Sequence, residues 1–202
     1  MAVAWMDERA VVLTDEPGFA AYDPESDCWR TLAAPPTGLT GPVRLFWTGR
    51  ELLAAGMPPG VASWNPATEV WTMAPLSPLG RSTDVPVLAG DQLVYLSYGS
   101  RVEGQVVDGA FDGPSAAWKV IDTPCRVSTD YAVWTGRVVT DGFHDAFDPV
   151  TGTCYRLPRT RDRSRTGELR SWTGQDFVIW SGGGGEEVPA KPDGIAFRPT
   201  TP

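Results

Sequence analysis

Short apolar runs separated by turn-forming residues make up nearly the whole chain. Typical runs are Leu52-Leu53-Ala54-Ala55-Gly56 and Phe177-Val178-Ile179-Trp180, and the 22 glycines and 19 prolines fall between such runs. No window shows the sustained period of about 3.6 residues that an amphipathic helix requires. The pattern therefore predicts an all-β protein built from many short strands and tight turns.

A corner made of an aromatic residue and Asp or Asn, followed by a second aromatic residue, recurs along the chain. The copies are Tyr22-Asp23-Pro24 with Trp29, Trp64-Asn65-Pro66 with Trp71, Phe111-Asp112-Gly113 with Trp118, Phe147-Asp148-Pro149 with Tyr155, and the partial copy Phe197-Arg198-Pro199. The steps between copies are 42, 47, 36 and 50 residues. A self-similar unit of this length indicates a repeat architecture, which specifies a scaffold more closely than an activity.

A second marker lies upstream of each corner. It is Trp-Thr-Gly at residues 47–49, 134–136 and 172–174, and Leu88-Ala89-Gly90 and Trp5-Met6-Asp7 fill the same slot. Each marker lies between two apolar strands, and its Gly or Asp accepts a positive φ. Each marker is therefore predicted to be a hairpin turn. One unit is therefore four antiparallel strands, which is the signature of a β-propeller blade, and the recurring tryptophans are expected to pack between blades.

These markers together resemble bacterial kelch repeats, the type also seen in galactose-oxidase-like β-propellers. The resemblance covers nearly the whole chain and implies one kelch-like β-propeller domain at residues 1–202. Five four-stranded blades are recognisable, at about 1–38, 39–80, 81–125, 126–164 and 165–202. Because the last blade lacks a visible fourth strand, we expect an incomplete propeller: a fragment, an open array, or a chain completed by a further segment or a partner chain.

The two faces of the predicted propeller differ in how constant their loops are. The turn after the first strand and the corner before the fourth are nearly invariant, so the variation in repeat length falls in the connections that emerge on the other face. Individual loops carry function, so we expect any ligand on this variable face. On the constant face, Asp23, Asn65, Asp112 and Asp148 are expected to cap their own turns.

Composition narrows the class of partner. The formal net charge of −8 disfavours nucleic acid and anionic membranes, which both require a basic surface. No apolar stretch approaches the roughly 20 residues of a membrane span. The first residues lack a basic start and an apolar stretch, so they do not predict a signal peptide. Similar bacterial kelch proteins are often exported, and the sequence leaves the compartment open.

The cysteines and the single histidine carry little predicted chemistry. Cys28, Cys125 and Cys154 are odd in number and fit no metal-binding spacing. Cys28 and Cys154 occupy the same repeat position in separate blades, so we expect no disulfide between them and interpret the cysteines as small buried hydrophobic residues. His144 alone cannot supply a copper-radical oxidase site, which needs two histidines in the galactose oxidase family, and it predicts neither a zinc site nor a serine–histidine triad.

Carboxylates at the starts of the predicted inner strands are the first candidate site. Asp84, Asp130 and Glu168 share one position in consecutive blades, where blade 2 has Val43. Gathered around one channel mouth, they can bind Ca²⁺ or sugar hydroxyls, or form an acid/base pair. The alternative is that they are solvated strand starts, paired with the neighbouring arginines Arg81, Arg126 and Arg165.

An arginine-rich segment between the last two blades is the second candidate. It contains Arg156, Arg159, Arg161, Arg163, Arg165 and Arg170. Such a segment can capture a carboxylate, a phosphate or a sulfated glycan. It can equally be a solvated loop or pair with the carboxylates described above.

The sequence therefore favours a non-catalytic binding or scaffold propeller that recognises a protein or a glycan on its variable face, without a resident cofactor. Its predicted ligand-binding residues are Asp84, Asp130, Glu168, Arg81, Arg126, Arg163 and Arg165. The alternative is a carbohydrate-active propeller enzyme whose channel-mouth carboxylates are catalytic, with Asp130 and Glu168 as candidates; Ca²⁺ is the alternative cofactor.

Overall fold

The structure is a computed structural model that describes residues 1–14, 18–39, 43–56, 60–80, 85–97, 108–129, 131–157, 168–182 and 193–198. Within these ranges the chain forms five antiparallel sheets, each with its strands in sequence order. The described residues contain no helix long and apolar enough to cross a membrane. The all-β prediction is confirmed.

Four sheets have four strands and the last has three. Blade 1 consists of β1 (Ala2–Met6), β2 (Arg9–Leu13), β3 (Phe19–Asp23) and β4 (Cys28–Leu32). Blade 2 consists of β5 (Arg44–Trp47), β6 (Leu52–Gly56), β7 (Gly60–Asn65) and β8 (Val70–Met73). Blade 3 consists of β9 (Val87–Ala89), β10 (Gln92–Tyr95), β11 (Gly109–Asp112) and β12 (Ala117–Val120). Blade 4 consists of β13 (Val133–Trp134), β14 (Val139–Thr140), β15 (Asp145–Asp148) and β16 (Thr153–Arg156), and blade 5 of β17 (Leu169–Trp172), β18 (Phe177–Trp180) and β19 (Gly194–Phe197).

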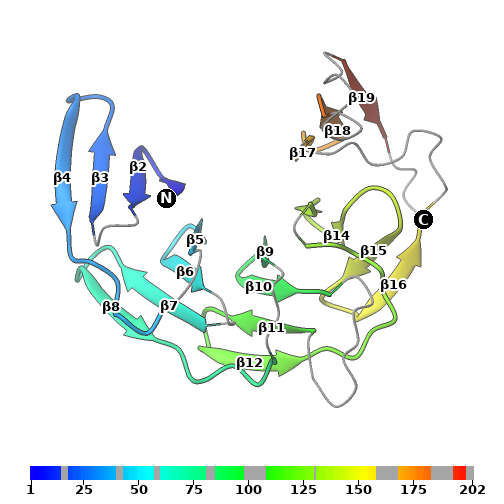
Figure 1. Ribbon diagram of the computed structural model, residues 1–202, viewed down its shortest axis with the longest axis horizontal. Helices are drawn as coiled ribbons and strands as arrows, with labels where there is room; N and C mark the ends of the chain where they lie inside the picture. The colour runs from blue at the N-terminus through cyan, green and yellow to red at the C-terminus, as the bar shows by residue number, and fades with distance from the viewer. Residues whose placement is uncertain are drawn as a thin grey trace.

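The blades form a five-bladed, propeller-like ring with the first strand of each blade innermost (Figure 1). The innermost strands contact one another from blade to blade, β1 with β5, β9 with β13, and β13 with β17. Among the described residues, blade 5 has no fourth strand, as the sequence predicted. Figure 1 also shows an opening between blade 1 and blade 5.

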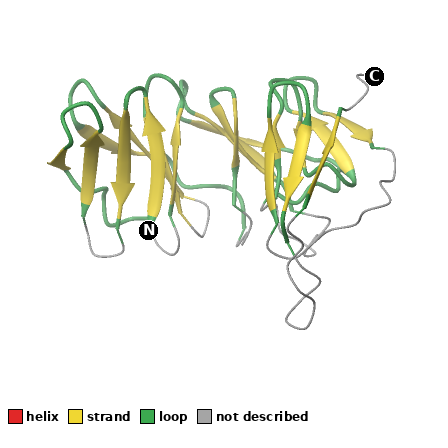
Figure 2. Ribbon diagram, turned by 90° about the horizontal axis from the view of Figure 1, so that it is seen from above, coloured by secondary structure: helices red, strands yellow, loops and turns green. Residues whose placement is uncertain are grey.

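The constant face is built by turns whose chemistry is local. In blade 2, Thr48 Oγ1 accepts a hydrogen bond from the Glu51 N–H at 3.1 Å and donates to the Glu51 carbonyl at 3.0 Å. Gly49 between them has a φ of 89°, which glycine adopts without a steric penalty. Thr135 and Thr173 make the same bonds in blades 4 and 5. Figure 2 shows such turns along one edge of the ring.

The corner residues cap their own turns, as predicted. Side-chain oxygens of Asp23, Asn65, Asp112 and Asp148 each accept hydrogen bonds from backbone N–H groups two or three residues ahead. Burial raises the pKa of the Asp148 carboxyl. Hydrogen bonds from the N–H groups of Thr151 and Val150 lower it by more, so the pKa lies below its ordinary value.

The hydrophobic core lies between blades, and tryptophans fasten one blade to the next. Phe19 of blade 1 packs against Trp64 and Trp71 of blade 2, with ring centroids 5.5 and 5.4 Å apart. Trp71 Nε1 donates to the Ala33 carbonyl, just after the last strand of blade 1, at 2.8 Å. Blade 3 repeats this bond, because Trp118 Nε1 donates to a carbonyl just after blade 2 at 2.9 Å. The predicted packing of tryptophans between blades is confirmed for Trp64, Trp71 and Trp118.

Blade 1 presents the same kind of face, and no blade in the described part of the chain covers it. Strand register aligns Trp5, Ala10, Tyr22 and Trp29 across blade 1, just as it aligns Trp47, Leu52, Trp64 and Trp71 across blade 2. Trp64 is 1% exposed, whereas Trp29 is 62% exposed. Across the opening, Leu169 and Trp180 of blade 5 are also exposed.

Candidate functional site

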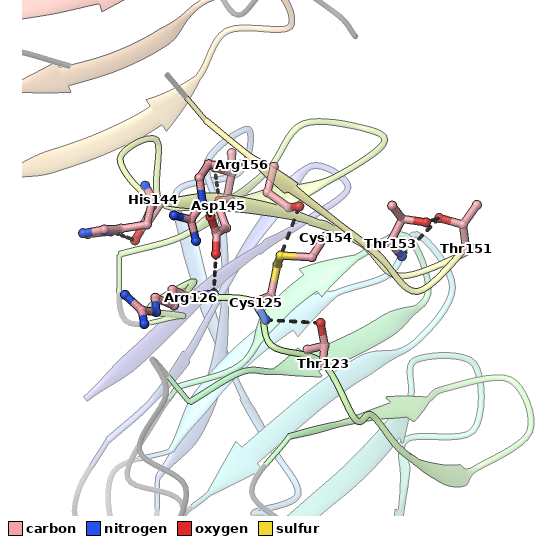
Figure 3. Close-up of a disulfide and its surroundings, with 12 residues drawn as sticks. Thr123, Cys125, Arg126, His144, Asp145, Thr151, Thr153, Cys154 and Arg156 are labelled. Carbon is pink, nitrogen blue, oxygen red and sulfur yellow. Dashed lines mark hydrogen bonds and ion pairs between the residues drawn. A yellow bond between two sulfur atoms is a disulfide. The ribbon is translucent and has the colours of Figure 1, made fainter. Parts of the chain in front are cut away.

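Chemically active side chains gather at the end of blade 4 that lies opposite its constant-face corner. The chain leaves β14 at Thr140, enters β15 at Asp145 and returns at the end of β16, where Arg156 pairs in register with Asp145. Figure 3 shows His144, Arg126 and Arg156 around Asp145, away from the corner that carries Thr151 and Thr153. This end of blade 4 belongs to the face that the sequence predicted to be variable.

Asp141 and His144 form an oriented pair. The Asp141 side chain is buried and its Oδ1 accepts hydrogen bonds from the N–H groups of Phe143 at 2.9 Å and His144 at 3.2 Å. Asp141 Oδ2 lies 3.0 Å from His144 Nδ1, and the His144 side chain is 44% exposed. A carboxylate at Nδ1 fixes the orientation of the ring, and Nδ1 donates to it when it carries the proton.

Glycine is required in the turn that holds this pair. Gly142 has a φ of 79°, and an added Cβ would lie 2.7 Å from the Phe177 ring of blade 5. The connection between β14 and β15 therefore passes close to blade 5, which places Asp141 and His144 beside the junction of the two blades.

Asp145 is a second buried carboxylate, and it holds two arginine-bearing segments. Its Oδ2 accepts a hydrogen bond from the Arg126 backbone N–H at 2.8 Å, and its Oδ1 lies 3.5 Å from Arg156 Nε. The Asp145 side chain is 4% exposed, whereas that of Arg156 is 77% exposed and Arg126 is also exposed. The Asp145 carboxylate is thus buried beneath two arginine side chains that are exposed to solvent.

A disulfide between Cys125 and Cys154 lies next to Asp145, and it corrects the prediction for the cysteines. The Cα atoms of the pair are 5.5 Å apart, and Cys28 is free and exposed. Cys154 pairs in register with Phe147, in the place that tryptophan takes in blades 1 to 3, whereas Cys28 pairs with Asp23. The two cysteines that the sequence placed at one repeat position therefore differ by one register step.

The disulfide takes the place of the indole hydrogen bond that links blades 2 and 3 to the preceding blade. In blades 2 and 3 the tryptophan at this position bonds to the segment just after the preceding blade. In blade 4, Cys154 is joined covalently to Cys125, which lies in the segment just after blade 3. The same contact between blades is made three times, the third time by a covalent bond.

Glu168 and Arg170 form a buried ion pair between blades 4 and 5. Arg170 Nε donates to Glu168 Oε1 at 2.7 Å, and Arg170 Nη1 donates to the Asp141 carbonyl at 2.9 Å. The guanidinium lies between the rings of Tyr131 and Phe143, 4.8 and 4.6 Å from their centroids. The Glu168 side chain is fully buried. This arrangement secures the junction of two blades and turns the Glu168 carboxylate away from solvent.

Most of the predicted site residues lie outside the described part of the chain. These are Asp84, Asp130, Arg81, Arg163 and Arg165. The gathering of three carboxylates at a channel mouth therefore stays a prediction. Of the two described residues, Arg126 belongs to the group around Asp145 and Glu168 is enclosed with Arg170.

Sequence reasoning missed Asp141, Asp145 and the disulfide, and it used His144 only to exclude sites. One signal was available: two aspartates flank the single histidine within Asp141-Gly-Phe-His-Asp145. Both carboxylates are buried but accept backbone N–H bonds, and the exposed groups above them are an imidazole and two guanidinium groups. Such a surface can bind a carboxylate, phosphate or sulfate group.

Comparisons with known proteins support the fold. No protein-family model matches the chain, and no curated protein matches it. The solved structure of YjhT matches with a TM-score of 0.64 at 14% sequence identity, over 92% of this chain and 72% of that chain. At this identity the likeness shows the fold alone, a kelch-like β-propeller arrangement.

Proposed function

We propose that this protein is a non-catalytic binding propeller of the kelch type that recognises an anionic protein or glycan on its variable face. The observation that carries the proposal is the end of blade 4, where Arg126, Arg156 and His144 are exposed above buried carboxylates. A planar guanidinium binds carboxylate, phosphate or sulfate groups through two parallel hydrogen bonds.

The supports of these side chains favour binding. The backbone at Arg126 is fixed by Asp145, Arg156 ends a strand, and the ring of His144 is held by Asp141. Groups held on rigid elements lose less conformational freedom when a ligand binds. In a chain of net charge −8, exposed cationic groups at one end of a blade also favour that end for a negatively charged ligand.

A carbohydrate-active enzyme that uses Asp130 and Glu168 is the alternative. A glycosidase needs two carboxyl groups that reach the substrate, roughly 5 to 10 Å apart across an open site. The Glu168 carboxylate is buried and bonded to Arg170, which weighs against a catalytic role for it. We therefore favour the binding function.

The test is a screen of the purified protein on arrays of carboxylated and sulfated glycans and of acidic peptides, followed by calorimetry on any ligand found. The double variant Arg126→Glu/Arg156→Glu should weaken binding by more than about tenfold, since each charge-assisted bond contributes about 1.5–3 kcal/mol. Arg137→Glu is the matched control, because Arg137 is an exposed arginine in the constant-face turn of the same blade. Equal losses in both variants, or no anionic ligand on either array, would contradict the proposal.

We also propose that a further segment or a partner chain completes the ring beside blade 1. The uncovered tryptophan face supports this, because the equivalent face of blade 2 is covered by a neighbouring blade. Hydrogen–deuterium exchange of β1 to β4, with and without a candidate partner, tests it, since a covering blade must slow exchange there.

A further inference from the structure

Three potential metal ligands meet at the contact between blades 3 and 4. The Sγ atoms of Cys125 and Cys154 and a carboxylate oxygen of Asp145 all lie within 4.8 Å of one another. Figure 3 shows the disulfide beside Asp145, with Asp145 on β15, Cys154 on β16 and Cys125 on the segment that follows blade 3. In the disulfide the sulfur atoms are bonded to each other, and on reduction each becomes a thiol.

Asp145 retains capacity for a cation. Its Oδ2 is occupied by the Arg126 N–H at 2.8 Å, but Oδ1 has only Arg156 Nε at 3.5 Å, on a side chain that is 77% exposed. A carboxylate that is 4% exposed is costly to bury in its ionised form unless a positive charge compensates it. The long separation and the exposure of Arg156 leave Oδ1 accessible to a metal ion.

We propose that the reduced protein binds one Zn²⁺ through Cys125 Sγ, Cys154 Sγ and Asp145 Oδ1, with water as the fourth ligand. Zn²⁺ takes thiolate and carboxylate ligands in tetrahedral geometry, with bonds of about 2.3 Å to sulfur and about 2.0–2.2 Å to oxygen. Those bond lengths place neighbouring ligand atoms about 3.5–3.8 Å apart. The three ligand atoms lie within 4.8 Å of one another, so side-chain rotations that separate the two sulfur atoms after reduction complete the site.

Strand pairing and hydrogen bonds hold the backbone around the site. Asp145 and Cys154 lie on neighbouring strands, β15 and β16, whose register places them on the same side of the sheet. The segment that carries Cys125 is held by the bond from the Arg126 N–H to Asp145 and by the bond from the Cys125 N–H to Thr123 Oγ1 at 3.3 Å. Hydrogen bonds to a metal-binding carboxylate orient it, so the Arg126 N–H supports the ligand.

Disulfide and metal are alternative states of the same two sulfur atoms. With a phosphine reductant, the disulfide takes up two electrons and two protons, and the phosphine becomes a phosphine oxide whose oxygen comes from water. Zn²⁺ then displaces the two thiol protons to the buffer as it binds both sulfur atoms. The contact between blades 3 and 4 is thus held by a covalent bond in one state and by a metal ion in the other. This inference does not depend on the proposed ligand-binding function.

Cobalt titration of the reduced protein tests the site. The background is Cys28→Ala, which removes the exposed free thiol. We expect one equivalent of Co²⁺ to give thiolate charge-transfer bands and the intense visible bands of tetrahedral cobalt, and one equivalent of Zn²⁺ to abolish them. Cys154→Ser should remove the charge-transfer signal, and Asp145→Asn should weaken Co²⁺ binding by more than about tenfold.

A second measurement keeps the test decisive if a cysteine variant fails to fold. In the reduced wild-type protein, Zn²⁺ should protect Cys125 and Cys154 from alkylation while Cys28 is modified, as mass spectrometry of the peptides reports. Alkylation of all three cysteines at equal rates with Zn²⁺ present, in protein whose circular dichroism is native, would overturn the site. Unchanged Co²⁺ affinity in Asp145→Asn would overturn the assignment of the third ligand.

Discussion

Reduction of the Cys125–Cys154 disulfide should lower the free energy of unfolding by about 3.6 kcal/mol. The two cysteines are 29 residues apart in sequence. In the chain-entropy description, closing a loop of that length removes about 12 cal/mol/K from the unfolded chain, which is about 3.6 kcal/mol at 25 °C. A domain has about 5–15 kcal/mol in total, so reduction should weaken the fold without abolishing it.

The assay is urea unfolding of the Cys28→Ala protein with and without a phosphine reductant, in the presence of a metal chelator. With a slope of about 2–3 kcal/mol/M, the midpoint should fall by about 1–2 M on reduction. The double variant Cys125→Ala/Cys154→Ala is the control and should not respond to the reductant. A shift of less than about 0.3 M at an unchanged slope would refute the reasoning, because the cross-link would then not restrict the unfolded chain as the loop length requires.

Three further predictions concern the turns and the tryptophans. Ala116 has a φ of 51° at the corner position where blade 4 has Gly152, with a φ of 71° and open space around it. Ala116→Gly should therefore stabilise the protein by about 0.5–1 kcal/mol and Gly152→Ala should destabilise it by about 1 kcal/mol, as chemical denaturation will show; a loss in the first variant would contradict this. Because folding lowers the pKa of Asp148, the carboxylate contributes fully to stability above its unfolded pKa, and this contribution is lost as the pH falls through the folded pKa. Asp148→Asn should therefore flatten the acid limb of a stability–pH curve. An unaltered acid limb would argue against the cap. Trp71→Phe removes an indole hydrogen bond and should lower the free energy of unfolding by about 1 kcal/mol. The equivalent Trp29→Phe on the uncovered face should lower it by less than about 0.5 kcal/mol, as urea unfolding will show. Equal losses would mean that the face of blade 1 is covered in solution.

The parts of the fold that could be predicted from the sequence are those whose cause is local. Asn65 caps its turn through backbone N–H groups only two and three residues away. Gly49 is needed by the φ of a single turn. Each of these causes lies within a few residues, and each recurs from blade to blade, so the repeat shows them several times over. The tryptophan contacts were predictable for the same reason, because one packing rule is applied at successive blade junctions.

The site could not be predicted in the same way, because its contacts join segments that the repeat does not align. Cys154 stands opposite Phe147 because the strand register is the same as in the other blades, while the aromatic residue of blade 4, Tyr155, comes one residue later. Cys125 lies in a connection between blades, where the repeat gives no register. Glu168 pairs with Arg170 of the strand that follows it, a contact that the sequence did not predict, whereas Arg165, the partner that the sequence offered, lies outside the described residues.

The propeller fold does not require the buried carboxylate of Asp145 at the end of blade 4. In strand register, the position of Asp145 is occupied in the other blades by Ala20, Ala62, Gly109 and Ile195. A propeller blade therefore accepts a small or apolar residue there, and a buried carboxylate breaks the local rule at a cost in desolvation. The cost is offset in part by the Arg126 N–H and by Arg156, both of which belong to the same end of the blade. A charge that the repeat does not need, beside two cysteines and below exposed cationic groups, supports the proposal that this end of blade 4 binds a ligand.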